Sequence, residues 1–263
     1  MSPWFNLTSL KGDRVVSLQL PKNNRILSST ALAVCLLLSI KTTFAQQRRA
    51  PEGGQRAVVV DERLAALRDA PDFSATLLHR LSRGRMVAVR GARRTSEGVT
   101  FYRVAVTKRT GGWIQSEAVV STLRKGDDER LLHLIQNSED FDRAARARIF
   151  LDVFPRSPLR PTVLMLYGEA AEKVAAKLSR DASRRLDEKE MLAGGAPVFT
   201  YFLNYSGLDR YRRQGIVFVF DRTTKQFHYD GASWREVLRR YPHSPEAADA
   251  RKLLDALAAV AVK

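Results

Sequence analysis

Cysteine is almost absent from this chain, whose 263 residues include only Cys35. Cys35 lies in an apolar run near the N-terminus, so removal of that run leaves no thiol. Such a chain has no disulfide, no cysteine nucleophile and no cysteine-based metal site. Histidine is also scarce, and none of the four falls in an HExxH or other metal-ligand spacing: His79, His133, His228 and His243. The sequence therefore predicts neither a metal nor a cofactor.

Sequence signatures of catalysis are lacking as well, because the chain contains no P-loop, GxSxG or GxGxxG motif. The densest polar cluster holds His228, Asp230 and Ser233, but neighbours along a strand and its turn do not normally converge as a triad does. Asp230 before a glycine is typical of a turn, and Ser233 with Glu236 predicts a helix capping box. We predict a protein that is not an enzyme; an unrecognised envelope enzyme using His228 and Asp230 is the remaining alternative.

Acidic residues are few: 28 stand against 44 basic ones, for a formal charge of +16. A basic chain is attracted to polyanions such as nucleic acid, anionic lipid or acidic wall polymers. The arginines and lysines are scattered, however, and no segment shows a dense basic block with interleaved aromatics. We expect no specific nucleic-acid binding, and a salt-dependent attraction to anionic wall polymers or lipid headgroups.

The N-terminal segment holds one short apolar run, from Ser28 to Ile40. Lys22 and Arg25 precede it and Ala45 follows it, which is the pattern of a secretory signal peptide. The run is shorter than the ~20 residues that a transmembrane helix needs. The sequence predicts a signal peptide over 1–45 cleaved after Ala45, and a secreted or periplasmic protein that meets the membrane only through this segment. An uncleaved membrane anchor is the alternative.

Residues 46–56 are polar, contain proline and paired glycine, and are expected to form a flexible linker. Residues 57–122 then alternate between short apolar runs and turn residues. Gly84, Gly98 and the Gly111–Gly112 pair interrupt the runs, as in a small, strongly bent β-barrel.

The order of landmarks in this region resembles the bacterial SH3 (SH3b) family. A turn at Pro71 precedes a leucine strand, and Phe101-Tyr102 and Trp113 match the family's Trp-Tyr pair and its Gly-Trp-Ile/Val position. The resemblance implies a non-catalytic module that binds peptidoglycan or peptide, with Phe101, Tyr102 and Trp113 as candidate ligand contacts. Strand alternation places Phe101 and Tyr102 on opposite faces, so one of them is expected in the core.

Three arginines in or beside the loop before Val99 complete the candidate site: Arg90, Arg93 and Arg94. Guanidinium groups bind carboxylates and phosphates in a bidentate manner. A solvated basic loop without a ligand explains the same residues, and both interpretations stay open.

The remaining residues, 123–263, predict a helical region. One helix begins near Asp127, a second ends near Phe154 because prolines follow, and a third has Pro161 in its first turn. A β-hairpin is predicted near 215–230, and helices over 233–240 and 245–259 follow.

The segment Phe154-Pro155-Arg156-Ser157-Pro158 recurs as Tyr241-Pro242-His243-Ser244-Pro245, each time between two predicted helices. This junction resembles the inter-helix turn of tetratricopeptide-like repeats, although two unrelated helical hairpins could share the same turn chemistry. We therefore expect an α+β multidomain fold, with a small SH3-like β-barrel followed by a mostly α-helical region containing a hairpin.

The expected function is binding at the cell envelope. The barrel would engage peptidoglycan or peptide, and the helical region an envelope protein. An assembly scaffold, in which the barrel only packs against the helices through an apolar contact, is the second hypothesis.

Overall fold

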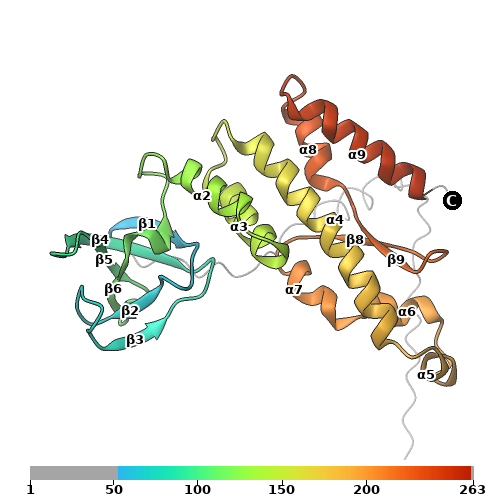
Figure 1. The fold of residues 1–263 in the computed structure, drawn as a ribbon, viewed down its shortest axis with the longest axis horizontal. Coiled ribbons are helices and arrows are strands. Elements are labelled where there is room, and N and C mark those ends of the chain that lie inside the picture. Colours follow the sequence, from blue (N-terminus) through green and yellow to red (C-terminus); the bar gives the residue numbers. More distant parts are fainter. Residues whose placement is uncertain (1–52, 262–263) are drawn as a thin grey trace, which may run out of the picture. The chain divides into compact units, whose positions relative to one another are not determined.

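A computed structural model describes residues 53–261 (Figure 1). The described residues all belong to one compact unit. The predicted signal peptide and the start of the predicted linker lie outside the described residues. Within 53–261, no helix is long and apolar enough to cross a membrane.

Seven antiparallel strands form the first part of the described chain, in the order β3-β2-β6-β5-β4-β1-β7. A short 3-10 helix, η1 (Ser116–Ala118), precedes the last strand. The strands are β1 (Gln55–Val59), β2 (Ala66–Arg68), β3 (Leu77–Arg80), β4 (Met86–Arg94), β5 (Thr100–Ala105), β6 (Gly111–Gln115) and β7 (Val119–Val120).

The strands of the predicted SH3-like barrel form an open sheet, because the end strands β3 and β7 do not pair within residues 53–261. Strand β7 has only two residues, and the carbonyl of Val119 accepts a hydrogen bond from the Arg130 side chain. Every residue of β3 is exposed. The helical region thus engages one edge of the sheet, and the other edge is open to solvent.

The inner face of the sheet carries its own apolar core. Fully buried side chains from several strands meet there, among them Val59, Leu67, Val87 and Ile114. Gly112 is required where β6 passes β2, since a Cβ at this position would lie 2.5 Å from the Arg68 carbonyl oxygen. Gly84 and Gly98 interrupt the strands as predicted, whereas Gly111 and Gly112 are the first two residues of β6.

Helices dominate the second part, as predicted. They are α2 (Asp127–Gln136), α3 (Asp140–Val153), α4 (Arg160–Arg185), α5 (Glu188–Ala193), α6 (Val198–Leu203), α7 (Asp209–Arg212), α8 (Ala232–Arg240) and α9 (Glu246–Ala261), with the 3-10 turn η2 (Ser206–Leu208) before α7. Helix α3 ends directly before Phe154, and Pro161 stands in the first turn of α4, so both proline-based predictions are confirmed.

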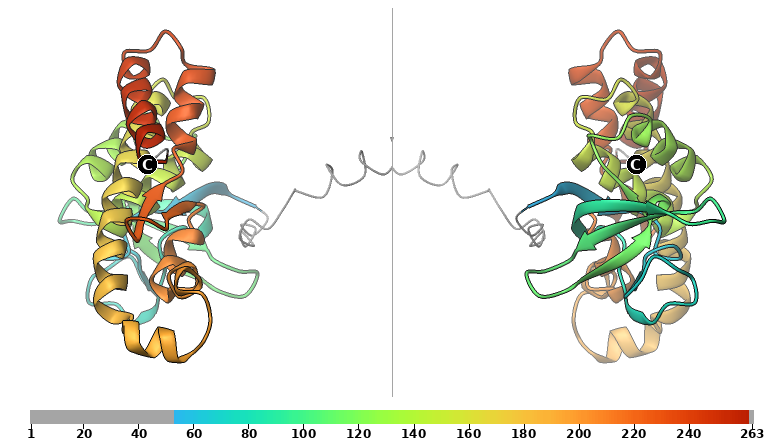
Figure 2. Two further views of the ribbon diagram at one scale, coloured as in Figure 1. Left: turned by 90° about the vertical axis from the view of Figure 1, so that its right-hand side faces the viewer. Right: turned by 90° about the vertical axis from the view of Figure 1, so that its left-hand side faces the viewer.

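Helix α4 is the centre of the helical core. Its predicted apolar stripe is buried along its length, from Val163 through Tyr167 to Leu178. Helices α3 and α8 pack on it, and α8 also packs on α9 (Figure 2). At Gly168 the indole of Trp234 approaches so closely that a Cβ would lie 2.2 Å from its Nε1.

The predicted hairpin is present as strands β8 (Phe218–Asp221) and β9 (Gln226–Tyr229), which pair antiparallel. Strand β9 packs against α4, and the backbone N–H of Phe227 donates to Ser179 Oγ at 2.7 Å. The hairpin is thereby joined to the helical core through α4.

The two recurring aromatic-Pro-x-Ser-Pro segments adopt the same turn. In the first, the N–H of Ser157 donates to the Phe154 carbonyl at 3.2 Å; in the second, the N–H of Ser244 donates to the Tyr241 carbonyl at 3.0 Å. Both segments join two helices that pack on each other, α3 to α4 and α8 to α9. Tetratricopeptide-like repeats and two unrelated helical hairpins would both show this shared turn.

Candidate binding surface and junction pocket

Two arginines flank Trp113 on the outer face of the sheet. Residues that stand opposite each other in neighbouring antiparallel strands place their side chains on the same face. Arg103 of β5 is opposite Trp113 of β6, which is opposite Arg68 of β2. Arg103 is exposed, and Trp113 and Arg68 are half-buried. We call these three residues the Trp113 face.

Phe101, a predicted ligand contact, is only 1% exposed. Its ring is packed edge-on against Phe73, with 5.3 Å between centroids, and Phe73 itself is 45% exposed. Phe101 therefore reaches a ligand only if Phe73 moves away. Sequence analysis did not identify Phe73, because it lies in the irregular segment between β2 and β3. No periodic pattern there predicts that its ring packs over Phe101.

Tyr102 points to the opposite side of the sheet, as the alternation predicted. It is half-buried against the sheet core, and its hydroxyl oxygen accepts a hydrogen bond from Arg124 Nη1 at 3.4 Å. The structure thus separates Tyr102 from the Trp113 face, and both members of the aromatic pair contribute to packing.

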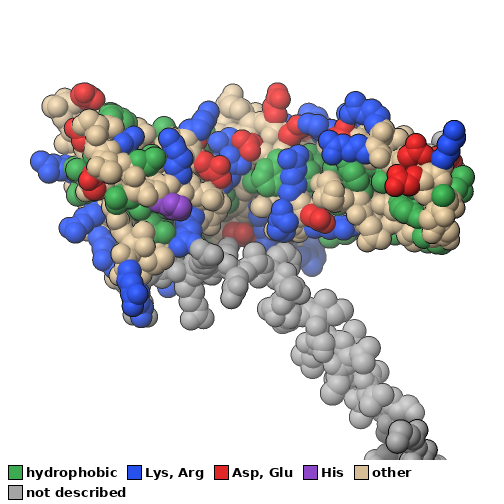
Figure 3. Space-filling view, turned by 90° about the horizontal axis from the view of Figure 1, so that it is seen from below, with side chains coloured by type: hydrophobic (Ala, Val, Ile, Leu, Met, Phe, Trp, Pro, Cys, Tyr) green, Lys and Arg blue, Asp and Glu red, His purple; other side chains and the backbone are tan. Residues whose placement is uncertain are grey.

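The three predicted arginines lie in the last part of β4 and are exposed, so they belong to a strand and not to the loop. Arg93 stands opposite Phe101, whereas Arg90 Nε donates to the Gly53 carbonyl and Arg94 Nε to the Gly98 carbonyl. Figure 3 shows Lys and Arg side chains distributed over this whole face of the molecule. Only Arg93 of the three shares a register position with a predicted aromatic contact.

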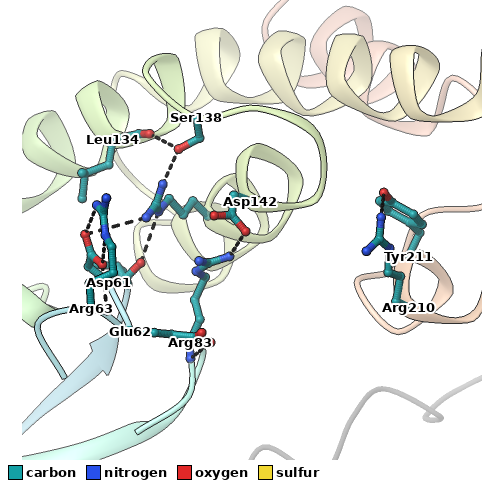
Figure 4. Close-up of polar contacts among 11 residues, drawn as sticks. Asp61, Glu62, Arg63, Arg83, Leu134, Ser138, Asp142, Arg210 and Tyr211 are labelled. Atoms are coloured by element: carbon teal, nitrogen blue, oxygen red, sulfur yellow. Dashed lines mark hydrogen bonds and ion pairs between the residues drawn. The ribbon is translucent and has the colours of Figure 1, made fainter. Parts of the chain in front are cut away.

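A second concavity lies where the sheet meets the helices, and sequence reasoning missed it. This junction pocket has a volume of about 840 Å³ and is lined by the segment after β1, the α2–α3 connection and residues of α3, α4 and α7 (Figure 4). No sequence pattern marks it, because its charged residues come from segments far apart in the chain.

Arg146 forms the buried side of the junction pocket and is 6% exposed. Its Nε donates to the Val60 carbonyl at 3.2 Å, its Nη1 donates to Ser138 Oγ, and its Nη2 lies 3.8 Å from Asp61 Oδ2. Arg63 also holds Asp61, with Nε at 2.9 Å from Oδ1, and this hydrogen bonding is the main reason that the pKa of Asp61 is lowered. One buried guanidinium of α3 thus joins the residue after β1 to the α2–α3 connection.

Arg83 makes a second ion pair across the junction, since its Nη1 lies 2.7 Å from Asp142 Oδ1 (Figure 4). The hydrogen bond from Arg83 is the main reason that the pKa of Asp142 is lowered. The backbone N–H of Arg83 donates to Glu62 Oε1 at 2.7 Å.

Asp140, the first residue of α3, pairs with Lys177 at 2.6 Å. Its backbone φ is 46°, a conformation seldom adopted by residues other than glycine.

His228 does not form the imagined set with Asp230 and Ser233. Its Nδ1 lies 3.0 Å from Glu172 Oε1 on α4, while Asp230 Oδ1 accepts the N–H of Ala232.

The capping-box prediction is also wrong. Gly231 is the residue before the helix, and Ser233 Oγ is buried with no hydrogen-bond partner among the described residues. Glu236 pairs with Arg160 at 2.9 Å instead. The left-handed Gly231 starts the helix two residues before the position that the local pattern predicted.

Within residues 53–261, no group of three or more His, Cys, Asp or Glu side chains is placed to hold a metal ion. No family model, no curated protein and no solved structure matches this chain.

Proposed function

We propose that this chain is a non-catalytic binding protein of the cell envelope. Its SH3b-like sheet module binds peptidoglycan or peptide, and its tetratricopeptide-like helical region binds a protein partner. The observation that carries the proposal is the Trp113 face, where Arg68 and Arg103 stand on either side of Trp113. The predicted signal peptide supports a secreted or periplasmic location.

The Trp113 face has the chemistry for an anionic glycopeptide. An indole offers a flat apolar surface with little conformational entropy to lose, and guanidinium groups bind carboxylates through paired hydrogen bonds. The exposed edge of β3 lies beside Arg68, because Leu77 is opposite that residue. An extended peptide that adds alongside β3 would meet the unpaired backbone groups of this edge.

Cosedimentation of the chain with purified peptidoglycan sacculi across a salt series tests the proposal. We expect binding that survives high salt and is abolished by Trp113→Ala, while Arg103→Gln weakens it about tenfold through loss of a charge-assisted contact. Arg109→Gln is the matched control, because Arg109 is exposed in the β5–β6 turn, away from the Trp113 face. Each variant's melting temperature verifies that it is folded.

Two results would overturn the proposal. One is that neither the wild-type chain nor any variant binds to sacculi. The other is that modest salt removes binding equally from the wild type and from every variant, including Arg109→Gln. In the second case the net charge of +16 accounts for the attraction. The variant Phe101→Ala is unsuitable here, since removal of a fully buried ring costs about 3–5 kcal/mol of folding free energy.

An assembly scaffold is the second candidate, and one observation favours it. Val60 and Val120 of the sheet region pack into the core of the helical region, so the two regions share apolar contact as the scaffold hypothesis expects. A scaffold would show no affinity for sacculi although Trp113 is intact. His228→Ala separates both candidates from an enzyme, because binding and assembly survive this substitution and turnover through His228 would not.

A further inference from the structure

The junction pocket differs from the Trp113 face in chemistry as well as in place. Its volume of about 840 Å³ lies within the range of small-ligand sites. Five cationic and five acidic side chains line it, so their formal charges cancel. The pocket therefore has no net charge with which to attract a simple anion or a simple cation.

Most of the acidic side chains in the junction pocket are already engaged. Asp61 accepts from Arg63, Asp142 accepts from Arg83, and Asp140 pairs with a lysine. A guanidinium has five N–H donors and an ammonium three, so each of these cations keeps donors that its carboxylate partner does not use. Although the charges balance, the pocket has a surplus of hydrogen-bond donors, and a surplus of donors favours a carboxylate ligand.

Arg210 is the cation best prepared to receive that carboxylate. Its guanidinium lies 4.6 Å from the ring centroid of Tyr211 and 5.3 Å from that of Phe141, and its Nη2 donates to the Tyr211 hydroxyl at 2.5 Å (Figure 4). Stacking and one hydrogen bond fix the plane of the group. Arg210 is exposed and lines the pocket, and no carboxylate among residues 53–261 pairs with it.

Glu139 provides the complementary group. It is exposed, lines the junction pocket and precedes the first turn of α3, but its side chain does not cap that helix. It has no ion pair or side-chain hydrogen bond within the described part of the chain. A carboxylate that is free at the rim of a pocket is the natural partner for a ligand ammonium group.

We infer that the junction pocket is a second binding site, for a small zwitterion that carries both an ammonium and a carboxylate group, such as a short peptide with free ends. Arg210 receives the ligand carboxylate and Glu139 the ligand ammonium. This site is independent of the proposed function, because no residue of the Trp113 face lines it.

Calorimetric titration of the purified chain with L-alanyl-L-alanine tests the inference. Two capped peptides serve as probes of the two ends: N-acetyl-alanyl-alanine lacks the ammonium, and alanyl-alanine amide lacks the carboxylate. We expect saturable binding of the uncapped dipeptide and about tenfold weaker binding of each capped form, since each loses a charge-assisted contact.

Variants identify the residue at each end. Glu139→Gln should abolish the difference between the free and the acetylated dipeptide, and Arg210→Gln the difference between the free dipeptide and its amide. Lys173→Gln, which removes an exposed charge of α4 outside the junction pocket, is the matched control and should retain full affinity. Trp113→Ala should retain it too, which separates this site from the Trp113 face.

The inference is overturned if the uncapped dipeptide shows no saturable binding in the millimolar range. It is also overturned if the capped peptides bind as well as the free one, or if Lys173→Gln weakens binding as much as the two pocket variants. All three outcomes are independent of whether sacculi bind.

Discussion

Replacement of Arg146 by methionine removes the buried guanidinium that joins the sheet to the helices. Methionine keeps most of the unbranched, apolar part of the side chain, so the change is mainly the loss of polar contacts. Two hydrogen bonds disappear, to the Val60 carbonyl and to Ser138 Oγ. Asp61 loses a partner 3.8 Å away but keeps the closer Arg63.

The cost follows from these contacts. A hydrogen bond to a charged group contributes about 1.5–3 kcal/mol, and a buried carbonyl left without a donor costs about 1–3 kcal/mol. The guanidinium is itself expensive to bury, which offsets part of the loss. We expect Arg146→Met to lower the free energy of unfolding by about 2–4 kcal/mol, out of the 5–15 kcal/mol that is typical of folded domains.

Urea denaturation followed by tryptophan fluorescence measures this cost, because Trp113 lies in the sheet and Trp234 in the helical core. Lys173→Met on α4 is the matched control. Lys173 is exposed and has no ion pair or side-chain hydrogen bond within the described residues. Substitutions at such surface positions usually change the free energy of unfolding by less than about 0.5 kcal/mol.

Two outcomes would refute the reasoning. One is an unfolding free energy of Arg146→Met within about 0.5 kcal/mol of the wild type, the range of ordinary surface substitutions. The other is an equal loss in Lys173→Met. Either result would mean that the sheet and the helices hold together through apolar contact and that the guanidinium is dispensable.

Three further predictions concern the helices and the junction. Gly168→Ala should lower the melting temperature despite alanine's better helix propensity, because the new methyl group overlaps the Trp234 indole and such overpacking costs about 1–3 kcal/mol. Gly91→Ala is the control and should leave the melting temperature nearly unchanged, because the space around Gly91 is open. In urea denaturation, Ser233→Ala should leave the free energy of unfolding within about 0.5 kcal/mol of the wild type, because Ser233 Oγ has no hydrogen-bond partner among the described residues. Asp230→Ala should lower it by about 1 kcal/mol, because Asp230 Oδ1 accepts the N–H of Ala232 in the first turn of α8. A larger loss in Ser233→Ala than in Asp230→Ala would support the capping box instead. The pKa of Asp142 is lowered in the folded chain, so this carboxyl stabilises the fold above its ordinary pKa of 3.8, and the stabilisation is lost as pH falls through the lower folded value. The stability difference between wild type and Asp142→Asn should therefore be full at neutral pH and shrink below pH 3.8, and a difference independent of pH would contradict the ion pair.

Local signals in the sequence predicted most of the elements. Proline positions defined the end of α3 and the first turn of α4, since proline cannot continue a helix but fits its first turn. The run of apolar residues from Ile216 and the turn after Asp221 predicted the hairpin. These features depend on a few neighbouring residues, so no knowledge of distant contacts is needed.

Errors arose where a local pattern competes with a neighbour in space or with another local arrangement. Ser233 fits a capping box, but Gly231 in the left-handed conformation starts the helix earlier and leaves Ser233 facing the core. Phe101 fits an exposed aromatic contact, but Phe73 covers it from 28 residues away. In each case the spacing is compatible with two structures, and packing selects one.

The amino-acid sequence by itself determined the succession of strands and helices, the apolar stripe of α4 and the alternation that separates Phe101 from Tyr102. Only the tertiary structure decided that the sheet is open and that Arg68, Trp113 and Arg103 share a face. It also decided that Arg146 binds a carbonyl 86 residues away to form one side of a pocket. Helical and strand periodicity are properties of adjacent residues, whereas strand pairing and ion pairs depend on how the whole chain returns to itself.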